Sequence, residues 1–155
     1  MLATYIAGTV APPTDPVVLA ALHAASLRSG VPLALLFSLA WQESRYVVSC
    51  RSDKGALGLM QLMPETAAEY NADPFNPAQA AQAGAQFLAG MQRRFAGSWA
   101  HALAGYVWGP SRVQRHPQPT SWPTQVQDYV RRVLGGAGYE LPFSVEVLTH
   151  VHGAR

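Results

Sequence analysis

The sequence has few residues of the kinds that form disulfides or bind metals. Cys50 is its only cysteine, so the chain can form no internal disulfide and no thiolate-based metal site. None of the five histidines has the spacing of a zinc motif, although His150 and His152 lie close together near the end of the chain. A glycine-rich phosphate loop and a Gly-x-Ser-x-Gly nucleophile motif are also missing. We therefore expect no metal and no cofactor.

Charged residues are scarce too, at 13% of the chain, and only nine residues are acidic. The formal net charge is +2, and the basic residues are scattered in pairs, which does not predict nucleic-acid binding. A mild positive balance suits an acidic polymer such as cell-wall glycan with its peptide carboxylates. We expect a monomer, since nothing in the sequence indicates an oligomer.

Long apolar runs are missing as well. No stretch approaches the roughly 18 to 20 apolar residues that span a bilayer, so we expect no integral membrane segment. The first eleven residues lack the basic start of a signal peptide. If the substrate lies outside the cytoplasm, we expect another delivery route, such as a phage particle or a secretion machine as partner.

The signals that are present are mainly helical. Capping residues, prolines in first turns and apolar residues at helical spacing predict helices at 15–30, 32–44, 64–70, 76–95, 98–109 and 124–135. Thr124 is expected to cap the last helix. Gly109-Pro110 ends the helix before it, and Pro117, Pro119 and Pro123 predict that the loop between the two helices is irregular. No alternation typical of strands occurs before the tail, where 143–148 is a candidate strand. The length fits one mostly α domain.

Glu43 is the most informative single residue. It follows Leu36 by seven positions and Leu39 by four, which places it close to the apolar stripe of a very apolar helix. A carboxyl group there loses hydration, so its pKa should rise and it should remain able to donate a proton near neutral pH. The alternative is an ordinary glutamate of a last helical turn that faces solvent and pairs with Arg45 or Arg51.

The segment 55–64 follows this helix and contains two glycines, which permit turns and close backbone approaches. Gln61 and Met63 lie two residues apart. In an extended piece of chain they would point the same way and offer an amide and an apolar wall to a ligand. The alternative is a buried turn that only connects two helices.

Four sequence blocks occur in one order over roughly residues 18 to 134. The blocks are Gln42-Glu43-Ser44 with 52–64; Asp73-Pro74 and Asn76-Pro77 with Gly84 and Leu88; 104–113; and 124–133 around Tyr129-Val130. Together they resemble the catalytic core of the soluble lytic transglycosylases.

This resemblance implies a lysozyme-like helical domain with a cleft for the glycan strands of peptidoglycan. In the family, the glutamate matching Glu43 protonates the glycosidic oxygen between N-acetylmuramic acid and N-acetylglucosamine. It then takes the proton of the muramic acid 6-hydroxyl, which closes on C1 to give a 1,6-anhydro product. We accordingly expect a catalytic domain at 15–135, an N-terminal extension at 1–14 and a tail at 136–155. The site of action would be periplasmic or otherwise outside the cytoplasm.

The resemblance also implies substrate-binding residues. Ser52, Gln61 and Met63 match cleft positions near the acid. Tyr106 matches a tyrosine beside the catalytic glutamate, and its phenol is expected to help hold the carboxyl group by a hydrogen bond. Tyr129 is expected to pack rather than to take part in the chemistry.

Three positions depart from the family pattern. Val107 and Trp108 stand where the family has an asparagine and a small residue, and Gln125 stands where it often has a glutamate. Trp108 would then add a surface for sugar stacking, and Gln125 would remove a charge near the substrate. Among the other tryptophans, we expect Trp41 and Trp99 in the core and Trp122 in a cleft wall. The three positions bear on substrate preference more than on the reaction.

Two alternatives to a lytic transglycosylase stay open. If Asp53 lay at the distance from Glu43 that two-carboxylate glycosidases need, the domain would be a hydrolytic muramidase. An inactive wall-binding domain of a phage or secretion machine is the third possibility. The presence of Glu43 argues against that last one.

Overall fold

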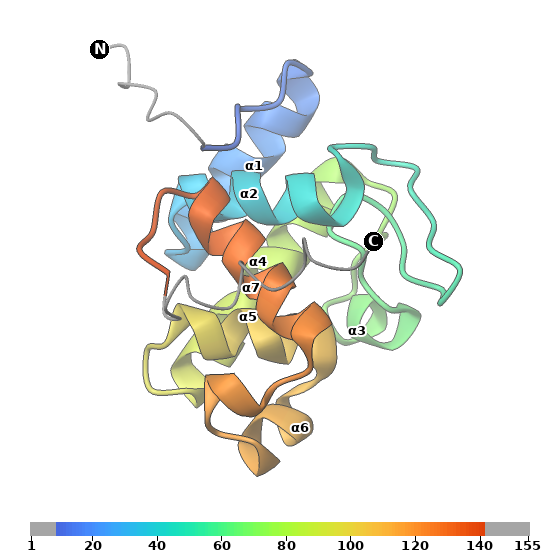
Figure 1. Cartoon of the computed structure of the whole chain (residues 1–155). Helices are drawn as coiled ribbons and strands as arrows, with labels where there is room; N and C mark the ends of the chain where they lie inside the picture. Colours follow the sequence, from blue (N-terminus) through green and yellow to red (C-terminus); the bar gives the residue numbers. More distant parts are fainter. Residues whose placement is uncertain (1–8, 142–155) are drawn as a thin grey trace, which may run out of the picture.

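The computed structural model describes residues 9–141, and this part of the chain is mostly helical, as predicted (Figure 1). Its elements are α1 (Pro16–Ser29), α2 (Leu33–Ser44), α3 (Pro64–Glu69), α4 (Pro77–Arg94), α5 (Trp99–Trp108), α6 (Pro110–Arg115), the 3-10 turn η1 (Pro119–Ser121) and α7 (Thr124–Gly136). Between residues 9 and 141 the only strand-like pairings are isolated bridges in the loop after α2. The candidate strand at 143–148 lies outside the described residues.

The helix starts follow local capping chemistry at three of the predicted places. Asp15, Asn76 and Ser98 each accept a hydrogen bond from a backbone N–H of the first turn that follows them, which satisfies a donor that has no partner inside the helix. The predicted cap at Thr124 is wrong. Pro123 occupies the cap position in an extended conformation, and no side chain caps α7.

The region between 110 and 123 is more ordered than the sequence predicted. The expectation of an irregular loop is wrong for 110–115, which form α6, whereas between 116 and 123 the only regular piece is the turn η1. Gly109, with φ of 97°, ends α5, and Pro110 then starts α6, because proline fits the first turn of a helix without losing a hydrogen bond. Val113 anchors α6 in the core. Trp122 is also buried, with 3% of its surface exposed, and its indole N–H donates to the carbonyl of His116 at 2.8 Å. Trp122 is therefore not part of a cleft wall.

The apolar helix α2 runs across the upper half of the view in Figure 1 and packs against α1 and α7. Leu35, Leu36 and Leu39 are fully buried. Ser38 is buried with them and donates to the carbonyl of Val133 on α7 at 2.6 Å, so this buried hydroxyl group is satisfied. The packing fixes the position of the end of α2 relative to α7.

Two glycines fix the loop between α2 and α3 to the rest of the fold. A Cβ at Gly58 would lie 1.7 Å from the carbonyl oxygen of Pro74, and Gly58 also has a φ of 75°. A Cβ on Gly84 of α4 would lie 2.8 Å from the terminal methyl group of Met60. Only glycine permits both approaches, so the segment 55–64 is held against α4 and the turn that precedes it.

The expectation that Trp41 belongs to the core is wrong, whereas Trp99 is partly buried against the core. Trp41 is 38% exposed, its ring lies 5.4 Å from that of Tyr46, and the Arg45 guanidinium lies 4.7 Å above it. Together with residues 9–14, Trp41 and Tyr46 line a hollow of about 440 Å³.

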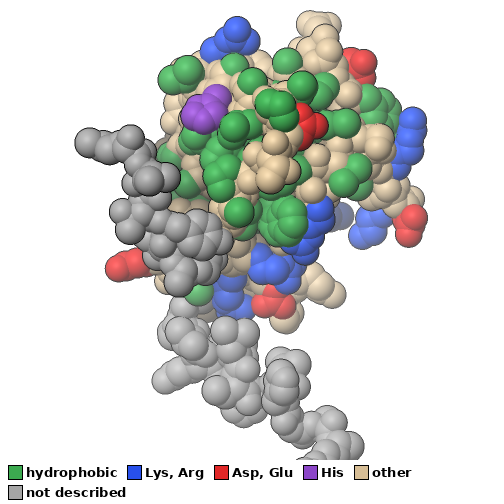
Figure 2. All heavy atoms as spheres, turned by 90° about the horizontal axis from the view of Figure 1, so that it is seen from above, with side chains coloured by type: hydrophobic (Ala, Val, Ile, Leu, Met, Phe, Trp, Pro, Cys, Tyr) green, Lys and Arg blue, Asp and Glu red, His purple; other side chains and the backbone are tan. Residues whose placement is uncertain are grey.

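Hydrophobic side chains are plentiful on the face seen from above (Figure 2). Across residues 9–141, no helix combines the length and the apolar character needed to cross a membrane.

Candidate active site

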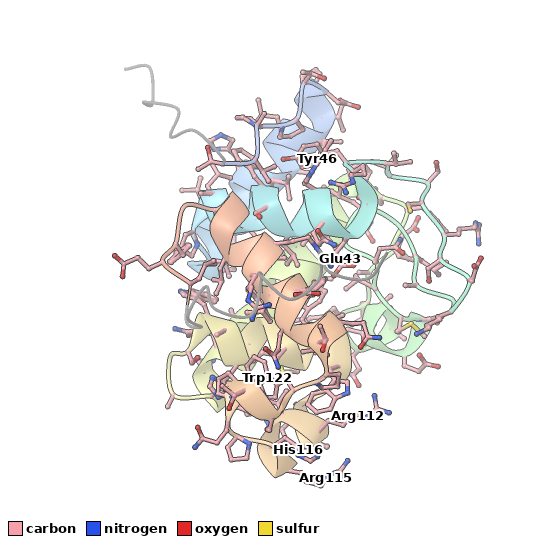
Figure 3. All side chains as sticks on the ribbon, in the orientation of Figure 1. Glu43, Tyr46, Arg112, Arg115, His116 and Trp122 are labelled. Carbon is pink, nitrogen blue, oxygen red and sulfur yellow. The ribbon has the colours of Figure 1, made fainter. Side chains whose placement is uncertain are left out.

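Glu43 lies in the last turn of α2, on the side of that helix that faces α7, whereas Tyr46 lies toward α1 (Figure 3). The phenol of Tyr129, on α7, donates a hydrogen bond to Oε1 of Glu43. No arginine or lysine within residues 9–141 forms a salt bridge with this carboxyl group. The pairing with Arg45 or Arg51 that a solvent-facing glutamate would make is therefore absent there.

Burial raises the pKa of Glu43 from its ordinary value of 4.5 to about 7, and the hydrogen bond from Tyr129 lowers it in part. Desolvation disfavours the charged form, while a donated hydrogen bond favours it. Since the raised value lies near neutrality, both the acid and the carboxylate are well populated at pH 7. A group in that condition can give a proton in one step and accept one in the next.

Two tyrosines lie beside Glu43, and their roles are the reverse of those expected. The phenol of Tyr106 donates to the carbonyl of Met60 at 2.7 Å, whereas the phenol of Tyr129 donates to Glu43. Tyr106 thus holds the loop, and the prediction that it holds the carboxyl group is wrong. Burial, with the charge of Glu43 as a second cause, raises the pKa of both phenols well above the ordinary value. Both therefore remain neutral donors.

The sequence contains a signal for the role of Tyr129. Tyr129 follows Val126 by three positions and precedes Val133 by four, so it lies on the buried stripe of α7. A hydroxyl group on such a stripe needs a hydrogen-bond partner. Across the α2–α7 contact, Glu43 is the partner it meets.

A groove of about 560 Å³ adjoins this pair, because Tyr129 is one of its lining residues. The lining residues are Lys54, Val107, Trp108, Arg112, Pro123, Gln125, Val126, Tyr129 and Arg132. They include three cations and no carboxylate. The sequence departures at 107, 108 and 125 are thus brought together along one groove.

Trp108 is in contact with His116 and Arg112. Its ring lies 5.6 Å from that of His116 with an interplanar angle of 34°, and its carbonyl accepts a hydrogen bond from Arg112 at 3.2 Å. Figure 3 shows Arg112 and His116 at the same end of the molecule, around α6. Val107 is 46% exposed beside it. An indole fixed in this way offers a flat apolar surface for a sugar ring.

A smaller hollow of about 120 Å³ lies next to Tyr106 and includes both Gln61 and Met63 in its lining. Gln61 has a φ of 47°, so the expectation of an extended segment there is wrong. Its side-chain amide donates to the carbonyls of Cys50 at 3.2 Å and Gly58 at 2.9 Å. Gln61 therefore braces the loop, while Met63 is 42% exposed.

Ser52 lies on an exposed turn and lines neither of these hollows. Its hydroxyl accepts a hydrogen bond from the backbone N–H of Ala56 at 3.0 Å. Asp53, next along the chain, is exposed. The described residues contain no group of three or more side chains that could hold a metal ion.

A protein-family model matches the part of the chain that contains Glu43 and the loop after α2. The transglycosylase SLT domain matches residues 20–126, which include α2, the loop after it and the start of α7. The chain belongs to this family. The SLT domain therefore has the mostly α, lysozyme-like fold that the sequence predicted.

Two kinds of relative agree with this assignment. The SLT domain is 36% identical over 93 residues to the peptidoglycan transglycosylase gp16 of Escherichia phage T7, a match that covers 55% of this chain and 7% of that protein. Among solved structures, it resembles an inactive mutant of the lytic transglycosylase Slt from Pseudomonas aeruginosa, with 26% identity, a TM-score of 0.68, and coverage of 81% of this chain and 24% of that one.

The SLT domain also resembles the 70 kDa soluble lytic transglycosylase SLT70 of Escherichia coli, with 23% identity and a TM-score of 0.68. This match covers 77% of the chain described here and 23% of that protein. The chain thus spans less than a quarter of the length of each of these relatives.

Proposed function

We propose that this SLT domain is a peptidoglycan lytic transglycosylase and that Glu43 is its single acid and base. The observation that carries the proposal is the state of Glu43, a largely buried carboxyl group whose pKa is raised to about 7 and which Tyr129 orients beside a groove. Matches to transglycosylases of a phage and of a bacterium support it. The catalytic unit would be residues 15–135.

In the first step, protonated Glu43 gives its proton to the glycosidic oxygen that joins C1 of N-acetylmuramic acid to the next sugar. The C1–O bond breaks, and the departing sugar leaves with a hydroxyl group. Positive charge develops on the muramic acid ring while Glu43 becomes a carboxylate. The hydrogen bond from Tyr129 stabilises that carboxylate.

In the second step, the Glu43 carboxylate takes the proton of the 6-hydroxyl of the same muramic acid. The oxygen of that hydroxyl forms a bond to C1, which gives the 1,6-anhydro product and returns Glu43 to its protonated form. No water is consumed. A pKa near the working pH suits both steps, because neither the acid nor the carboxylate is then a rare form.

The shortage of other carboxylates favours this reaction over hydrolysis. Glycosidases of the usual types need a second carboxyl group at roughly 5 to 9.5 Å from the first. Within residues 9–141, the groove next to Tyr129 has no acidic lining residue, and Asp53 is exposed on its turn. A hydrolytic muramidase is therefore the less favoured candidate.

The groove residues have chemical properties that suit a peptidoglycan strand. We assign Trp108 to stacking against a sugar ring and Gln125 to hydrogen bonding with hydroxyl or acetamido groups. Lys54, Arg112 and Arg132 line the same groove without a salt bridge in the part of the chain that is described. They would bind carboxylates of the lactyl group or of the peptides on the strand.

The remaining predicted residues would act at the edge of this groove. Met63 and Tyr106 line the smaller hollow, where Met63 would contact the substrate and Tyr106 would hold the loop. Gln61 would act chiefly through the same loop. Ser52 would contact the substrate from its exposed turn.

Since peptidoglycan lies outside the cytoplasm, the domain would act there, and its phage relative supports delivery by a phage particle.

The test is digestion of purified sacculi, followed by mass spectrometry of the released muropeptides. The proposal predicts products that are lighter by one water than those of a muramidase. The Glu43→Gln protein serves as the control and should release no product. Products with the hydrolytic mass would favour a muramidase on the same fold. Binding to sacculi without any released product would favour a wall-binding domain.

A further inference from the structure

A second polar hollow lies on the outer side of α4, away from the groove described above. It consists of two adjoining parts of about 220 Å³ and about 410 Å³, which share Arg28, Tyr70 and Gln86. We call it the α4 hollow. The lining residues that bear on its chemistry are Arg28, Tyr70, Gln79, Gln82, Gln86 and Arg93. None of the lining residues of the α4 hollow lines the groove that contains Tyr129.

The lining of the α4 hollow contains two arginines and no carboxylate. Arg28, at the end of α1, and Arg93, in the last turn of α4, line the larger part together. Neither forms a salt bridge with any residue between 9 and 141. Burial raises the pKa of the Tyr70 phenol, the charge of Glu69 raises it further, and Arg93 lowers it in part. Glu69 is not among the lining residues. Tyr70 thus stays a neutral hydrogen-bond donor.

The smaller part contains an unsatisfied acceptor. Oε1 of Gln82 is buried, and within residues 9–141 it is the one buried side-chain nitrogen or oxygen that lacks a hydrogen-bond partner. Buried polar atoms are nearly always paired, so this atom lacks a donor. Because Gln82 lines the hollow, a turn of its side chain would bring the unpaired oxygen to the N–H group of a ligand.

We propose that the α4 hollow binds a short acidic peptide, whose carboxylate is held by Arg28 and Arg93 while a peptide N–H donates to Gln82. The guanidinium groups suit a carboxylate because they form charge-assisted hydrogen bonds to it. The source that we assign, the stem peptides of peptidoglycan, rests on the proposed function. A neighbouring part of the wall would then be held on one side of α4 while the glycan lies in the groove near Glu43.

The test is NMR titration of the ¹⁵N-labelled full chain with a synthetic stem tetrapeptide that has free carboxylates. The fully amidated tetrapeptide serves as the comparison. The proposal predicts that the acidic peptide shifts the side-chain amide signal of Gln82 and binds at least about tenfold more tightly than the amidated one. Equal binding of the two peptides, or shifts confined to the groove around Trp108, would overturn it.

Matched variants assign the effect to individual residues. The double variant Arg28→Gln/Arg93→Gln should weaken acidic-peptide binding about tenfold or more, and Gln82→Met should weaken it by a smaller factor. Arg45→Gln/Arg115→Gln removes the same charge outside the α4 hollow and should leave binding within about twofold. If both double variants weakened binding equally, net charge rather than a built site would explain it, and the proposal would fail.

These measurements do not depend on cleavage. Peptide binding at the α4 hollow should persist in Glu43→Gln protein, which is expected to be inactive. Failure of the proposed function would therefore leave the peptide result unchanged. Absence of binding in an active protein would reject the α4 site alone.

Discussion

The end of α2 and the turn at 51–57 each carry one side-chain carboxyl group, Glu43 and Asp53. The two carboxyl groups differ in their burial and in their hydrogen bonds. Glu43 is largely buried under α7, accepts a hydrogen bond from Tyr129 and has a raised pKa. Asp53 is exposed on a turn that Ser52 closes with its own backbone and hydroxyl. A carboxyl group becomes an acid catalyst through the packing around it, and only the end of α2 provides such packing.

The two regions should differ most in how much turnover is lost when their carboxyl group is replaced by an amide. Glu43→Gln keeps the shape of the side chain and an acceptor for Tyr129, but it removes the proton. We expect turnover of sacculi to fall by about three orders of magnitude, within the range for loss of a general acid. The release of soluble muropeptides measures it. An unchanged circular dichroism spectrum would show that the fold is retained, and turnover above a tenth of the normal rate would contradict the assignment.

The burial of Glu43 should also make stability depend on pH. Because its folded-state pKa of about 7 lies above the ordinary 4.5, the unfolded chain releases this proton first as the pH rises. The contribution of Glu43 to stability should thus be greatest below pH 4.5, fall between pH 4.5 and 7, and then level off. The total loss should be about 3 kcal/mol, at about 1.4 kcal/mol per pH unit.

Urea denaturation at a series of pH values measures this loss, with Glu43→Gln as the reference protein. The variant should match the wild type near pH 4 and be the more stable protein at pH 8. If the difference between the two proteins were constant across this range, Glu43 would not be desolvated in the folded state.

The two tyrosines beside Glu43 allow a finer test. Tyr129→Phe removes the hydrogen bond to the carboxyl group, so we expect turnover to fall by about tenfold and the basic limb of the pH–rate profile to move to higher pH. Tyr106→Phe, which removes a bond to the carbonyl of Met60, should lower stability without moving that limb. A shift of equal size in both variants would mean that the hydrogen bond to Glu43 is not what sets the profile.

The smallest effect should come from the other carboxyl group. Asp53→Asn should change the turnover of sacculi by no more than about twofold, because Asp53 is exposed and forms no side-chain hydrogen bond or salt bridge in the described part of the chain. A loss comparable to that of Glu43→Gln would indicate a two-carboxylate hydrolase.

Local signals in the sequence were sufficient for most of the helices, though not for α6, and for the position of Glu43. Asp15, Asn76 and Ser98 cap helices as predicted, because capping depends only on neighbours along the chain. The position of Glu43 near the buried side of α2 follows from the helical repeat in the same way.

Contacts between distant segments were harder to predict. The packing of α7 against α2 brings Tyr129 to Glu43, whereas Tyr106, on α5, reaches the carbonyl of Met60. The exposure of Trp41 and the burial of Trp122 likewise depend on which segments cover them. None of these outcomes follows from the spacing of residues along the chain.

The most direct test of the account is an NMR titration of the carboxyl carbon of Glu43. Selective ¹³C labelling of glutamate gives the signals, and the signal that is absent from the Glu43→Gln protein identifies the residue. We predict a midpoint of about 7 in the free protein, as burial beneath α7 requires. A midpoint near 4.5 would place Glu43 in an environment like that of open water and would contradict its role as the proton donor.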